Sequence, residues 1–511
     1  MTEFSPATIA PMDIYNQKLL SEVHPPDWVN PQPADIYDLV VIGAGTAGLV
    51  VAAGAAGLGL GLKVALIESH LMGGDCLNVG CVPSKTMIRS ARTIGEIWQG
   101  QELGIKVEGV EIDFGAVMER MRRIRSEISH ADSASRFKDL GVDVFLGEGQ
   151  FASNNTVTVE DRVLKFKKAV IATGTRAAIP EIPGLVAAGY LTNETVFSLV
   201  KRPQRLAVIG GGPIGCELAQ TFRRLGCEVI LLHRGSQVLN KEDPAAAAIL
   251  QQVLLDEGVK LILDCQVQQV TTTAAGKTLS YSSNGRSDTA IVDEILIGAG
   301  RIPNIESLNL AIAGVAADAK GVEVNDYLQT NNSRIYAAGD VCMKWQFTHA
   351  ADAAARIVIK NTLFSPFGIG KTKLSSLVMP WVTYTEPEIA HVGLSDDDAH
   401  QAGIEFETIN IPMSSVDRAI TDGETLGFVK IIHRRGSDEI LGATIVASHA
   451  GDLISEVTTA MVNKIGLSKL SSTIHPYPTQ GDGIKKAADA YRRKLLTPRN
   501  QQLLGLLTKF S

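Results

Sequence analysis

The sequence is short of several features that mark particular protein classes. It has six cysteines in 511 residues, which is too few for a disulfide-stapled secreted fold. Its net charge is −7, and no segment is rich in Lys and Arg, so we expect no nucleic-acid partner. Four of the cysteines are expected to be packing residues: Cys216, Cys227, Cys265 and Cys342.

Long apolar runs are also missing. The longest, residues 39–67, is broken by glycines and contains a nucleotide-loop pattern, so we expect no membrane partner and no spanning helix. Residues 1–17 carry acidic side chains and no apolar segment, unlike a secretory signal. We therefore expect a soluble protein of the reducing cytoplasm, where a disulfide is usually transient and catalytic.

The first nucleotide-loop pattern follows a short apolar run. Residues 37–42 read as a buried strand, and Gly43-x-Gly45-x-x-Gly48 leads into a helix of small residues. The first glycine permits a tight turn, the second lets the backbone approach a pyrophosphate, and the third lets helix and strand pack closely. A second strand ends at Glu68, whose carboxylate can accept a ribose hydroxyl. This unit predicts a dinucleotide site.

The same pattern recurs in the middle of the chain. Gly210-x-Gly212-x-x-Gly215 again stands between a strand and a helix. The following strand ends in His233 and Arg234 instead of a carboxylate. An arginine there can pair with a 2′-phosphate, which favours NADPH over NADH.

Two dinucleotide loops suggest two dinucleotides, so we expect a hydride to pass from a nicotinamide to a flavin. A later strand leads into a turn at Gly174, and another ends at Asp340, whose carboxylate could bind a ribityl hydroxyl. Thr348 is predicted to be the N-cap of the next helix, whose dipole would favour a reduced, anionic flavin. The next residue, His349, either approaches the flavin or simply follows the cap.

A pair of thiols lies between these units, in the stretch "GGDCLNVGCVPSK". Cys76 and Cys81 have no further Cys or His at the spacing of a metal site. Two core cysteines in a glycine-rich turn beside Lys85 would be unusual. A helix beginning near Pro83 would lower a thiolate pKa, and a nearby cation would help. We therefore favour a redox couple over a core pair or a resident metal site.

These motifs together resemble the FAD-dependent pyridine nucleotide–disulfide reductases, over nearly the whole chain. The resemblance rests on the thiol motif and on "ATGT", "GGGPIGCELA", "GAGRIPN" with Gly300, and "AAGD". It implies that Cys76 meets the substrate and that Cys81 lies against the flavin as the charge-transfer thiol. It also implies that Lys85 and Glu217 form an ion pair near the flavin.

The resemblance implies an α/β fold with two Rossmann-like domains and an α+β C-terminal domain that makes a homodimer. The predicted order along the chain is an N-terminal arm (1–35), an FAD domain in two parts (36–179 and 300–372) around an NADP(H) domain (180–299), a dimerisation domain (373–495) and an apolar tail (496–511).

The acceptor depends on the C-terminal motif. Disulfide reductases of the family carry an acid–base His directly before Pro-Thr, where this chain has Tyr477. Asp482 stands where their Glu would be, and His475 could substitute only if the loop were rearranged. The Tyr arrangement resembles mercuric reductase, and Tyr190 matches a second tyrosine of that branch. Cys76 and Cys81 would then bind a soft metal ion transiently, as substrate.

The chain also departs from mercuric reductases. Residues 1–35 hold no Cys-x-x-Cys, and no Cys follows Cys342. The chain therefore lacks the cysteines with which mercuric reductases capture thiol-bound Hg(II). The tail instead places five apolar residues at helical spacing, and we hypothesise that it covers the thiol cleft with Phe510 as an anchor. Rival interpretations are a quinone or small-disulfide reductase and a slow flavin redox sensor. Dihydrolipoamide dehydrogenase is disfavoured by the missing His.

Overall fold

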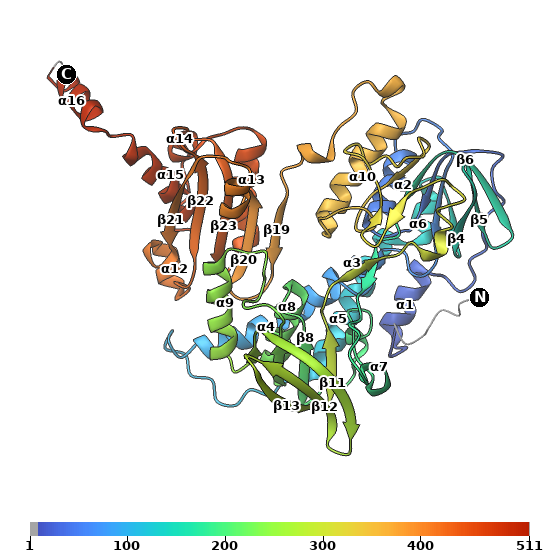
Figure 1. Cartoon of the computed structure of the whole chain (residues 1–511), viewed down its shortest axis with the longest axis horizontal. Helices are drawn as coiled ribbons and strands as arrows, with labels where there is room; N and C mark the ends of the chain where they lie inside the picture. The colour runs from blue at the N-terminus through green and yellow to red at the C-terminus, as the bar shows by residue number, and fades with distance from the viewer. Residues whose placement is uncertain (1–8, 510–511) are drawn as a thin grey trace.

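The computed structural model describes residues 9–509, except the side chains of Arg499, Leu503 and Leu504. It is a mixed α/β fold, as predicted, with two nucleotide-type parallel sheets and a separate antiparallel sheet. In Figure 1 these form three lobes, with the antiparallel sheet on the left, the first nucleotide sheet on the right and the second below. No helix within residues 9–509 is long and apolar enough to span a bilayer.

The first sheet has seven strands in the order β3-β2-β1-β6-β5-β4, with β18 beside β6. Alternate residues of β1 point to opposite faces of the sheet. Leu39 and Val41 pack against the helices on one face, and Val40 and Ile42 belong to the apolar cluster on the other face. Strands β3, β2, β1, β6 and β18 are parallel, so their carboxyl ends share one edge. The strands are β1 (Tyr37–Ile42), β2 (Val64–Glu68), β3 (Val142–Leu146), β4 (Gly149–Ser153), β5 (Thr156–Val159), β6 (Arg162–Ile171) and β18 (Ile335–Ala337).

The second nucleotide sheet is parallel, in the order β10-β9-β8-β14, and a three-stranded antiparallel sheet, β11-β12-β13, lies in the same lobe. Short strand pairs β7–β15 and β16–β17 complete the two nucleotide lobes. The strands are β7 (Thr175–Ala177), β8 (Arg205–Ile209), β9 (Glu228–Leu232), β10 (Lys260–Ile262), β11 (Cys265–Thr273), β12 (Gly276–Ser283), β13 (Arg286–Val292), β14 (Glu294–Ile297), β15 (Arg301–Pro303), β16 (Ala317–Asp318) and β17 (Gly321–Val322).

The C-terminal lobe contains an antiparallel sheet, β19-β20-β23-β22-β21. Every residue of its central strand, β23, is buried, because helices cover the sheet and neighbouring strands flank it. The elements are β19 (Pro380–Thr383), β20 (Glu388–Gly393), β21 (Phe406–Pro412), β22 (Phe428–Arg434), β23 (Ile440–Ala447), α11 (Asp396–Gln401), α12 (Asp417–Asp422), α13 (Ala450–Val462), α14 (Leu467–Ser472), α15 (Asp482–Lys494) and α16 (Pro498–Leu507).

The remaining helices surround the two nucleotide sheets. Helices α2 and α10 pack side by side on the first sheet, while α4 runs between α5 and α8 and so bridges the lobes. They are α1 (Ile14–Val23), α2 (Thr46–Ala56), α3 (Gly74–Asn78), α4 (Cys81–Gln99), α5 (Phe114–Ile128), α6 (Ala134–Asp139), α7 (Leu185–Ala188), α8 (Pro213–Arg224), α9 (Pro244–Asp256) and α10 (Thr348–Leu363).

Three details differ from the sequence expectations. The thiol helix α4 begins at Cys81 itself, two residues before the predicted Pro83. The N-cap of α10 is Phe347, not Thr348, which is the first helical residue. The N-terminal arm contains the helix α1, which the sequence pattern did not reveal. The tail does form a helix, α16, which projects away from the sheet in Figure 1, but its proposed anchor Phe510 lies outside the described residues.

Candidate active site

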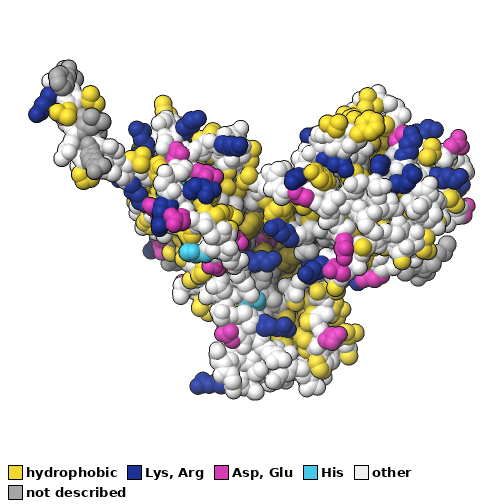
Figure 2. All heavy atoms as spheres, turned by 45° about the horizontal axis from the view of Figure 1, so that its top comes forward, with side chains coloured by type: hydrophobic (Ala, Val, Ile, Leu, Met, Phe, Trp, Pro, Cys, Tyr) yellow, Lys and Arg dark blue, Asp and Glu magenta, His cyan; other side chains and the backbone are white. Residues whose placement is uncertain are grey.

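One large cavity, of about 2940 Å³, lies where the three lobes meet. Figure 2 shows the surface deeply hollowed between the lobes. Most predicted site residues line this cavity: Gly43, Gly45, Glu68, Cys76, Cys81, Lys85, Gly174, Gly210, Gly212, Glu217, His233, Arg234, Gly300, Asp340, Thr348 and His349. Four do not line it: Gly48, Gly215, Tyr190 and Tyr477.

The first glycine loop has the geometry of a pyrophosphate cradle. Gly43 has a φ of 101°, and a Cβ atom on Gly48 would lie 1.8 Å from the Gly43 oxygen, so the third glycine serves packing and does not need to face the cavity. Gly45 is the N-cap of α2, and its side-chain position opens toward the cavity, with the nearest described atom 3.7 Å away. Anionic phosphates are stabilised at such a helix N-terminus.

Glu68 completes this first site. Its Oε2 accepts a hydrogen bond from the backbone N–H of Ala44 at 2.7 Å, and its Oε1 accepts one from His70 at 2.8 Å. Burial raises the pKa of Glu68, while these hydrogen bonds oppose the rise. The carboxylate is therefore fixed beside the glycine loop, at the carboxyl end of β2, where it can accept a ribose hydroxyl.

The second glycine loop repeats this geometry with one substitution. A Cβ atom on Gly215 would lie 1.8 Å from the Gly210 oxygen, and that on Gly212 would meet no described atom within 4 Å. In place of a carboxylate, His233 Nδ1 accepts a hydrogen bond from the Gly211 N–H at 3.0 Å. Its Nε2 lies 2.7 Å from Asn240 Oδ1, so both ring nitrogens of His233 help to hold the loop.

The strand edge between the two loops suits the isoalloxazine and ribityl parts of a flavin. Gly174 has a φ of 66° and no described atom within 4 Å of its side-chain position, which leaves space for a ligand. Asp340 Oδ2 accepts a hydrogen bond from the Thr175 hydroxyl at 3.2 Å, and burial raises the pKa of Asp340. Together with the first loop, these residues fit FAD, and Glu68, Gly45 and Asp340 would hold it.

The two thiols lie at the junction of α3 and α4. Cys76 is in the middle of α3, and Cys81 is the first residue of α4. Both are free thiols, and Cys81 Sγ lies 3.3 Å from the hydroxyl of Thr348, the first residue of α10. The N-termini of α4 and α10 therefore meet at Cys81.

This environment separates the pKa values of the two thiols. The hydrogen bond from Cys76 lowers the pKa of Cys81 to about 6, and Thr348 and Lys85 contribute to the lowering against the effect of burial. The pKa of Cys76 is raised by its hydrogen bond to Cys81 and by burial, with a further contribution from Asp132. Cys81 is therefore the thiolate of the pair at neutral pH.

An ion pair stands beside the thiols. Lys85 Nζ lies 2.8 Å from Glu217 Oε2, and Glu217 Oε1 accepts the N–H of Tyr384 at 2.9 Å. The ammonium group also lies 4.5 Å from the centre of the Tyr384 ring. Burial alone would lower the pKa of Lys85, but Glu217 and Cys81 raise it. Lys85 is therefore a fixed positive charge facing the cavity.

The sequence did not predict an aromatic wall beside Thr348, formed by the rings of Phe347, His349 and Trp381. Phe347 stacks on His349 at 5.4 Å and lies parallel to Trp381 of β19, with 6.4 Å between ring centroids. His349 Nε2 donates to the backbone oxygen of Pro380 at 2.7 Å, so this ring fastens α10 to β19 while lining the cavity. Only the pairing of segments far apart in sequence reveals this wall.

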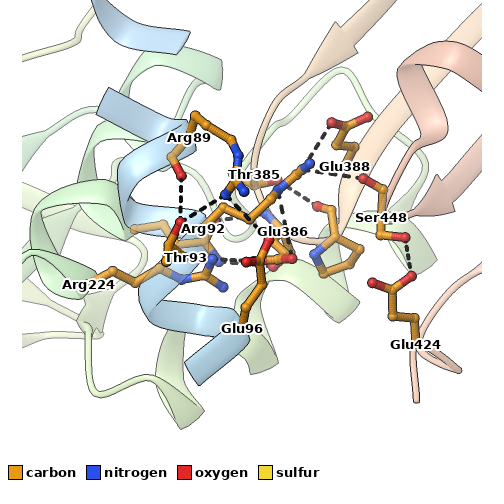
Figure 3. A network of polar contacts seen from close by, with 12 residues as sticks. Arg89, Arg92, Thr93, Glu96, Arg224, Thr385, Glu386, Glu388, Glu424 and Ser448 are labelled. Carbon is orange, nitrogen blue, oxygen red and sulfur yellow. Dashed lines mark hydrogen bonds and ion pairs between the residues drawn. The ribbon is translucent and has the colours of Figure 1, made fainter. Parts of the chain in front are cut away.

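Behind the thiol helix, a buried network of charges joins the lobes (Figure 3). Arg224 of α8 pairs with Glu257 and with Glu386, which precedes β20. Arg92 of α4 pairs with Glu388 at 3.1 Å and lies 3.8 Å from Glu386. The network therefore fixes the helix that begins at Cys81 against both other lobes.

The two predicted tyrosines lie elsewhere. Tyr190 packs against the apolar cluster of the second nucleotide lobe, away from the cavity surface. Tyr477 is 74% exposed, and its hydroxyl donates to Asp417 at 3.0 Å, which raises its pKa. His475 is tied to Glu456 at 2.7 Å with its side chain nearly buried, so it is not poised as a replacement acid–base.

The described residues contain no group of three or more His, Cys, Asp or Glu side chains arranged to hold a metal ion. The four cysteines outside the thiol motif are packing residues. Cys216, Cys227 and Cys265 are buried, and Cys342 packs at the edge of the core of the first lobe.

Comparison with known proteins identifies the family of the chain. Residues 37–355 match the family described as pyridine nucleotide-disulphide oxidoreductase, and residues 379–488 match its dimerisation domain. The mercuric reductase of Staphylococcus aureus is 36% identical over 453 residues, covering 88% of this chain and 82% of that protein. The dihydrolipoyl dehydrogenase of Chlamydia muridarum is 34% identical over 455 residues, covering 87% and 94%.

Two solved structures are similar over most of the chain. The HOCl-induced flavoprotein disulfide reductase RclA of Escherichia coli aligns with a TM-score of 0.78 and 27% identity, covering 89% of this chain and 99% of that one. LpdA of Mycobacterium tuberculosis aligns with a TM-score of 0.79 and 27% identity, covering 90% and 100%. Since the matched segments span most of the sequence, this chain belongs to the pyridine nucleotide-disulphide oxidoreductase family, which depends on FAD and takes electrons from a pyridine nucleotide.

Proposed function

We propose that the protein is an NADPH-dependent FAD oxidoreductase that passes electrons through Cys76 and Cys81 to a soft metal ion such as Hg(II), or to another small acceptor. The observation that carries the proposal is the difference between the pKa values of the two thiols and between their surroundings. Cys81, the thiolate, contacts Thr348, while the pKa of Cys76 is raised. A charge-transfer thiol and an interchange thiol need these two different environments.

Bound FAD supplies the two-electron relay between the nicotinamide and the disulfide. The chain's own residues prepare the site for it. Lys85, held by Glu217, keeps a positive charge at the cavity, which favours the arrival of a hydride and the negative charge that follows. Two electrons open the Cys76–Cys81 bond, and one proton is taken up by Cys76 while Cys81 stays a thiolate.

NADPH is the proposed donor because of the charges beside the second glycine loop. Arg234 and Lys241 line the cavity, are exposed, and make no ion pair among the described residues. His233 stands at the strand end in place of a carboxylate that would repel a 2′-phosphate. An arginine can bind such a phosphate in a bidentate manner.

The soft-metal acceptor is proposed from the residues around the interchange thiol. Tyr477 stands where disulfide reductases of the family carry an acid–base His, and a phenol is a weak proton donor at neutral pH. Asp132 lies near enough to Cys76 to raise its pKa, and this negative charge suits a cation better than an anionic disulfide. The similar RclA of E. coli has been solved as a Cu(II) complex.

The deciding experiment measures NADPH consumption with Hg(II) held by excess thiol, for the wild type and for Cys76→Ser. Turnover that is lost in the variant supports mercuric reduction. In that reaction NADPH loses two electrons and a proton to become NADP⁺, and the two electrons reduce Hg(II) to Hg(0). Negligible wild-type turnover, with FAD still readily reduced by NADPH, would leave the reductive half of the proposal standing and reject Hg(II) as acceptor.

A quinone is the second candidate acceptor, favoured by the aromatic wall. Phe347 and Trp381 present parallel rings to the cavity next to Thr348, and planar aromatic ligands bind such surfaces. Reduction of a quinone can proceed from the flavin alone. It should therefore persist in Cys76→Ser, whereas reduction of a metal ion or a small disulfide should stop.

The assembly is proposed to be a homodimer in the cytoplasm, built through the dimerisation domain. The domain boundaries given above and the tail's role as a cover for the partner's thiol cleft are part of this proposal. Removing residues 500–511 should raise turnover and thiol accessibility if the tail covers the cleft. Unchanged values would reject that role.

A further inference from the structure

The N-terminal helix α1 is packed into the protein although it precedes the matched family region, which begins at residue 37. Its residues Asn16, Leu19 and Val23 are fully buried, and it packs against α5. Residues 24–36 follow it, and there the Trp28 indole donates to the backbone oxygen of Val144, in the edge strand β3 of the first sheet, at 3.1 Å. This segment is therefore part of the folded FAD lobe.

A chain of buried polar groups leads from α1 to the thiol motif. Asn16 Oδ1 accepts a hydrogen bond from Arg125 Nη2 at 2.7 Å. Arg125 Nη1 donates at 2.6 Å to the backbone oxygen of Asn78, which ends α3 between the two redox cysteines. Both hydrogen bonds are buried, and Arg125 is 1% exposed.

Arg125 is an unusual group to bury in this way. It makes no ion pair among the described residues, and its Nε has no described partner. Burial lowers the pKa of Arg125 to about 10, the nearby Arg122 adds to the lowering, and Asp13, which pairs with Arg122, opposes it. A buried cation without a carboxylate is costly unless polar oxygens replace its water. The oxygens that do so here belong to α1 and to the thiol segment.

The thiol segment is held at a second point as well. The Asn78 side chain donates to the backbone oxygens of Met72 and Gly74 at 3.0 and 2.9 Å. The N–H of Met72 in turn donates to the backbone oxygen of Val23, the last residue of α1, at 3.1 Å. Both ends of α1 therefore act on the loop that carries the thiols.

We propose that α1 is a positioning element for the redox pair, acting through the Asn16–Arg125–Asn78 chain on the segment between Cys76 and Cys81. The inference rests on the proposed redox role of these thiols. When two electrons from NADPH, relayed by FAD, open the disulfide, the two sulfurs must separate. The Arg125 contact holds the intervening backbone in the conformation seen here, in which both cysteines are free thiols, so it favours the reduced form.

The test compares four variants of the full-length holoenzyme. Arg125→Met removes the cation and both hydrogen bonds, Arg125→Lys keeps the charge, and Asn16→Ala removes only the support from α1. Arg123→Met is the matched control, because Arg123 is an exposed residue of the same helix whose one ion pair among the described residues is with Glu127. The measurements are the midpoint potential of the thiol pair, the pH at which charge-transfer absorbance appears, FAD content and melting temperature.

We expect Arg125→Met to shift the thiol–disulfide equilibrium about tenfold toward the disulfide, a potential lower by about 30 mV. Asn16→Ala should shift it in the same direction by less, Arg125→Lys should recover part of the loss, and Arg123→Met should match the wild type. If Arg125→Met does not fold, Asn16→Ala decides. Potentials and pH profiles unchanged in folded, FAD-loaded variants would overturn the inference.

Failure of the proposed function would look different. In that case the wild type itself would gain no titratable thiols on reduction by NADPH, and both ideas would be rejected together. A wild-type pair that gains two thiols, beside variants that do not differ from it, would reject the positioning role alone.

Discussion

The sulfur of Cys81 lies 3.3 Å from the hydroxyl of Thr348, and this contact joins the first turns of two helices from distant parts of the sequence. Helix N-termini favour negative charge. The hydrogen bond from Cys76 lowers the pKa of Cys81 most, and Thr348 and Lys85 add to the lowering. The position of Cys81 at one helix N-terminus and against another favours the same charge, so it, and not Cys76, is the thiolate of the pair.

The first prediction concerns the pH dependence of this thiolate. The pKa of Cys81 is lowered to about 6 from a usual value near 9, so the thiolate is present at neutral pH and is lost as the pH falls through 6. Charge-transfer absorbance of the reduced enzyme should follow the same curve. Thr348→Val removes one hydrogen bond to the thiolate and should move the midpoint up by about one pH unit.

Thr348→Ser is the control for this titration, because it keeps the hydroxyl and loses only a methyl group. Its curve should coincide with that of the wild type. A Thr348→Val curve that also coincided would show that the hydroxyl does not stabilise the thiolate.

The second prediction concerns the ion pair of Lys85 and Glu217. Glu217→Gln leaves the lysine without its carboxylate, so the pKa of Lys85 should fall and its charge should be less firmly held. Reduction of FAD by NADPH, followed by stopped flow, should slow about 100-fold. Glu228→Gln, at an exposed position of β9, should leave the rate unchanged, and an equal slowing in both variants would count against the role.

The third prediction concerns the choice of nucleotide. Arg234→Ala should raise the KM for NADPH about 10- to 100-fold, because it removes a charge-assisted hydrogen bond to the 2′-phosphate. The KM for NADH should change little. Arg286→Ala, at an exposed arginine of β13, is the control. If the KM values for NADPH and NADH rose together, Arg234 would be acting on the fold of the loop and not on a 2′-phosphate.

Much of the nucleotide chemistry was predictable because it depends on local sequence. Gly43 is needed for the positive φ of one tight turn and Gly48 for a close approach to the Gly43 oxygen, and both constraints act within six residues. The same holds for Gly210 and Gly215. The glycine loops and the strands beside them followed from such short patterns, whereas the fold class was implied by the resemblance of all the motifs together to one family.

The rest depends on contacts between distant segments. Arg125 is an ordinary residue in an amphipathic helix, and only the packing of α1 beside it reveals its buried role. Trp381 and Phe347 form a wall only because β19 and α10 meet. Tyr190 matched a pattern but lies away from the cavity, because the backbone directs its ring into the apolar cluster.

The fourth prediction concerns the stability of the junction behind α4. Arg224 is 95% buried and pairs with Glu386 (Figure 3). It also pairs with Glu257, from another segment. Arg224→Met removes the guanidinium that both carboxylates share. It should lower the free energy of unfolding by about 3–5 kcal/mol, measured by chemical denaturation. Arg418→Met breaks only an exposed pair with Asp422 and should cost less than about 1 kcal/mol. Equal costs would mean that the network does not stabilise the junction.

The last prediction concerns Tyr477, which is exposed and does not line the cavity of its own chain. If it serves the thiols of the partner in a two-fold dimer, each active site takes Cys76 from one subunit and Tyr477 from the other. Cys76→Ser and Tyr477→Phe homodimers should then both be impaired, while a mixed dimer keeps one site with both native residues. Unfolding and refolding the two variants together should restore about a quarter of the wild-type activity. A mixture no more active than the average of its parents would show that Tyr477 acts within its own chain or not at all.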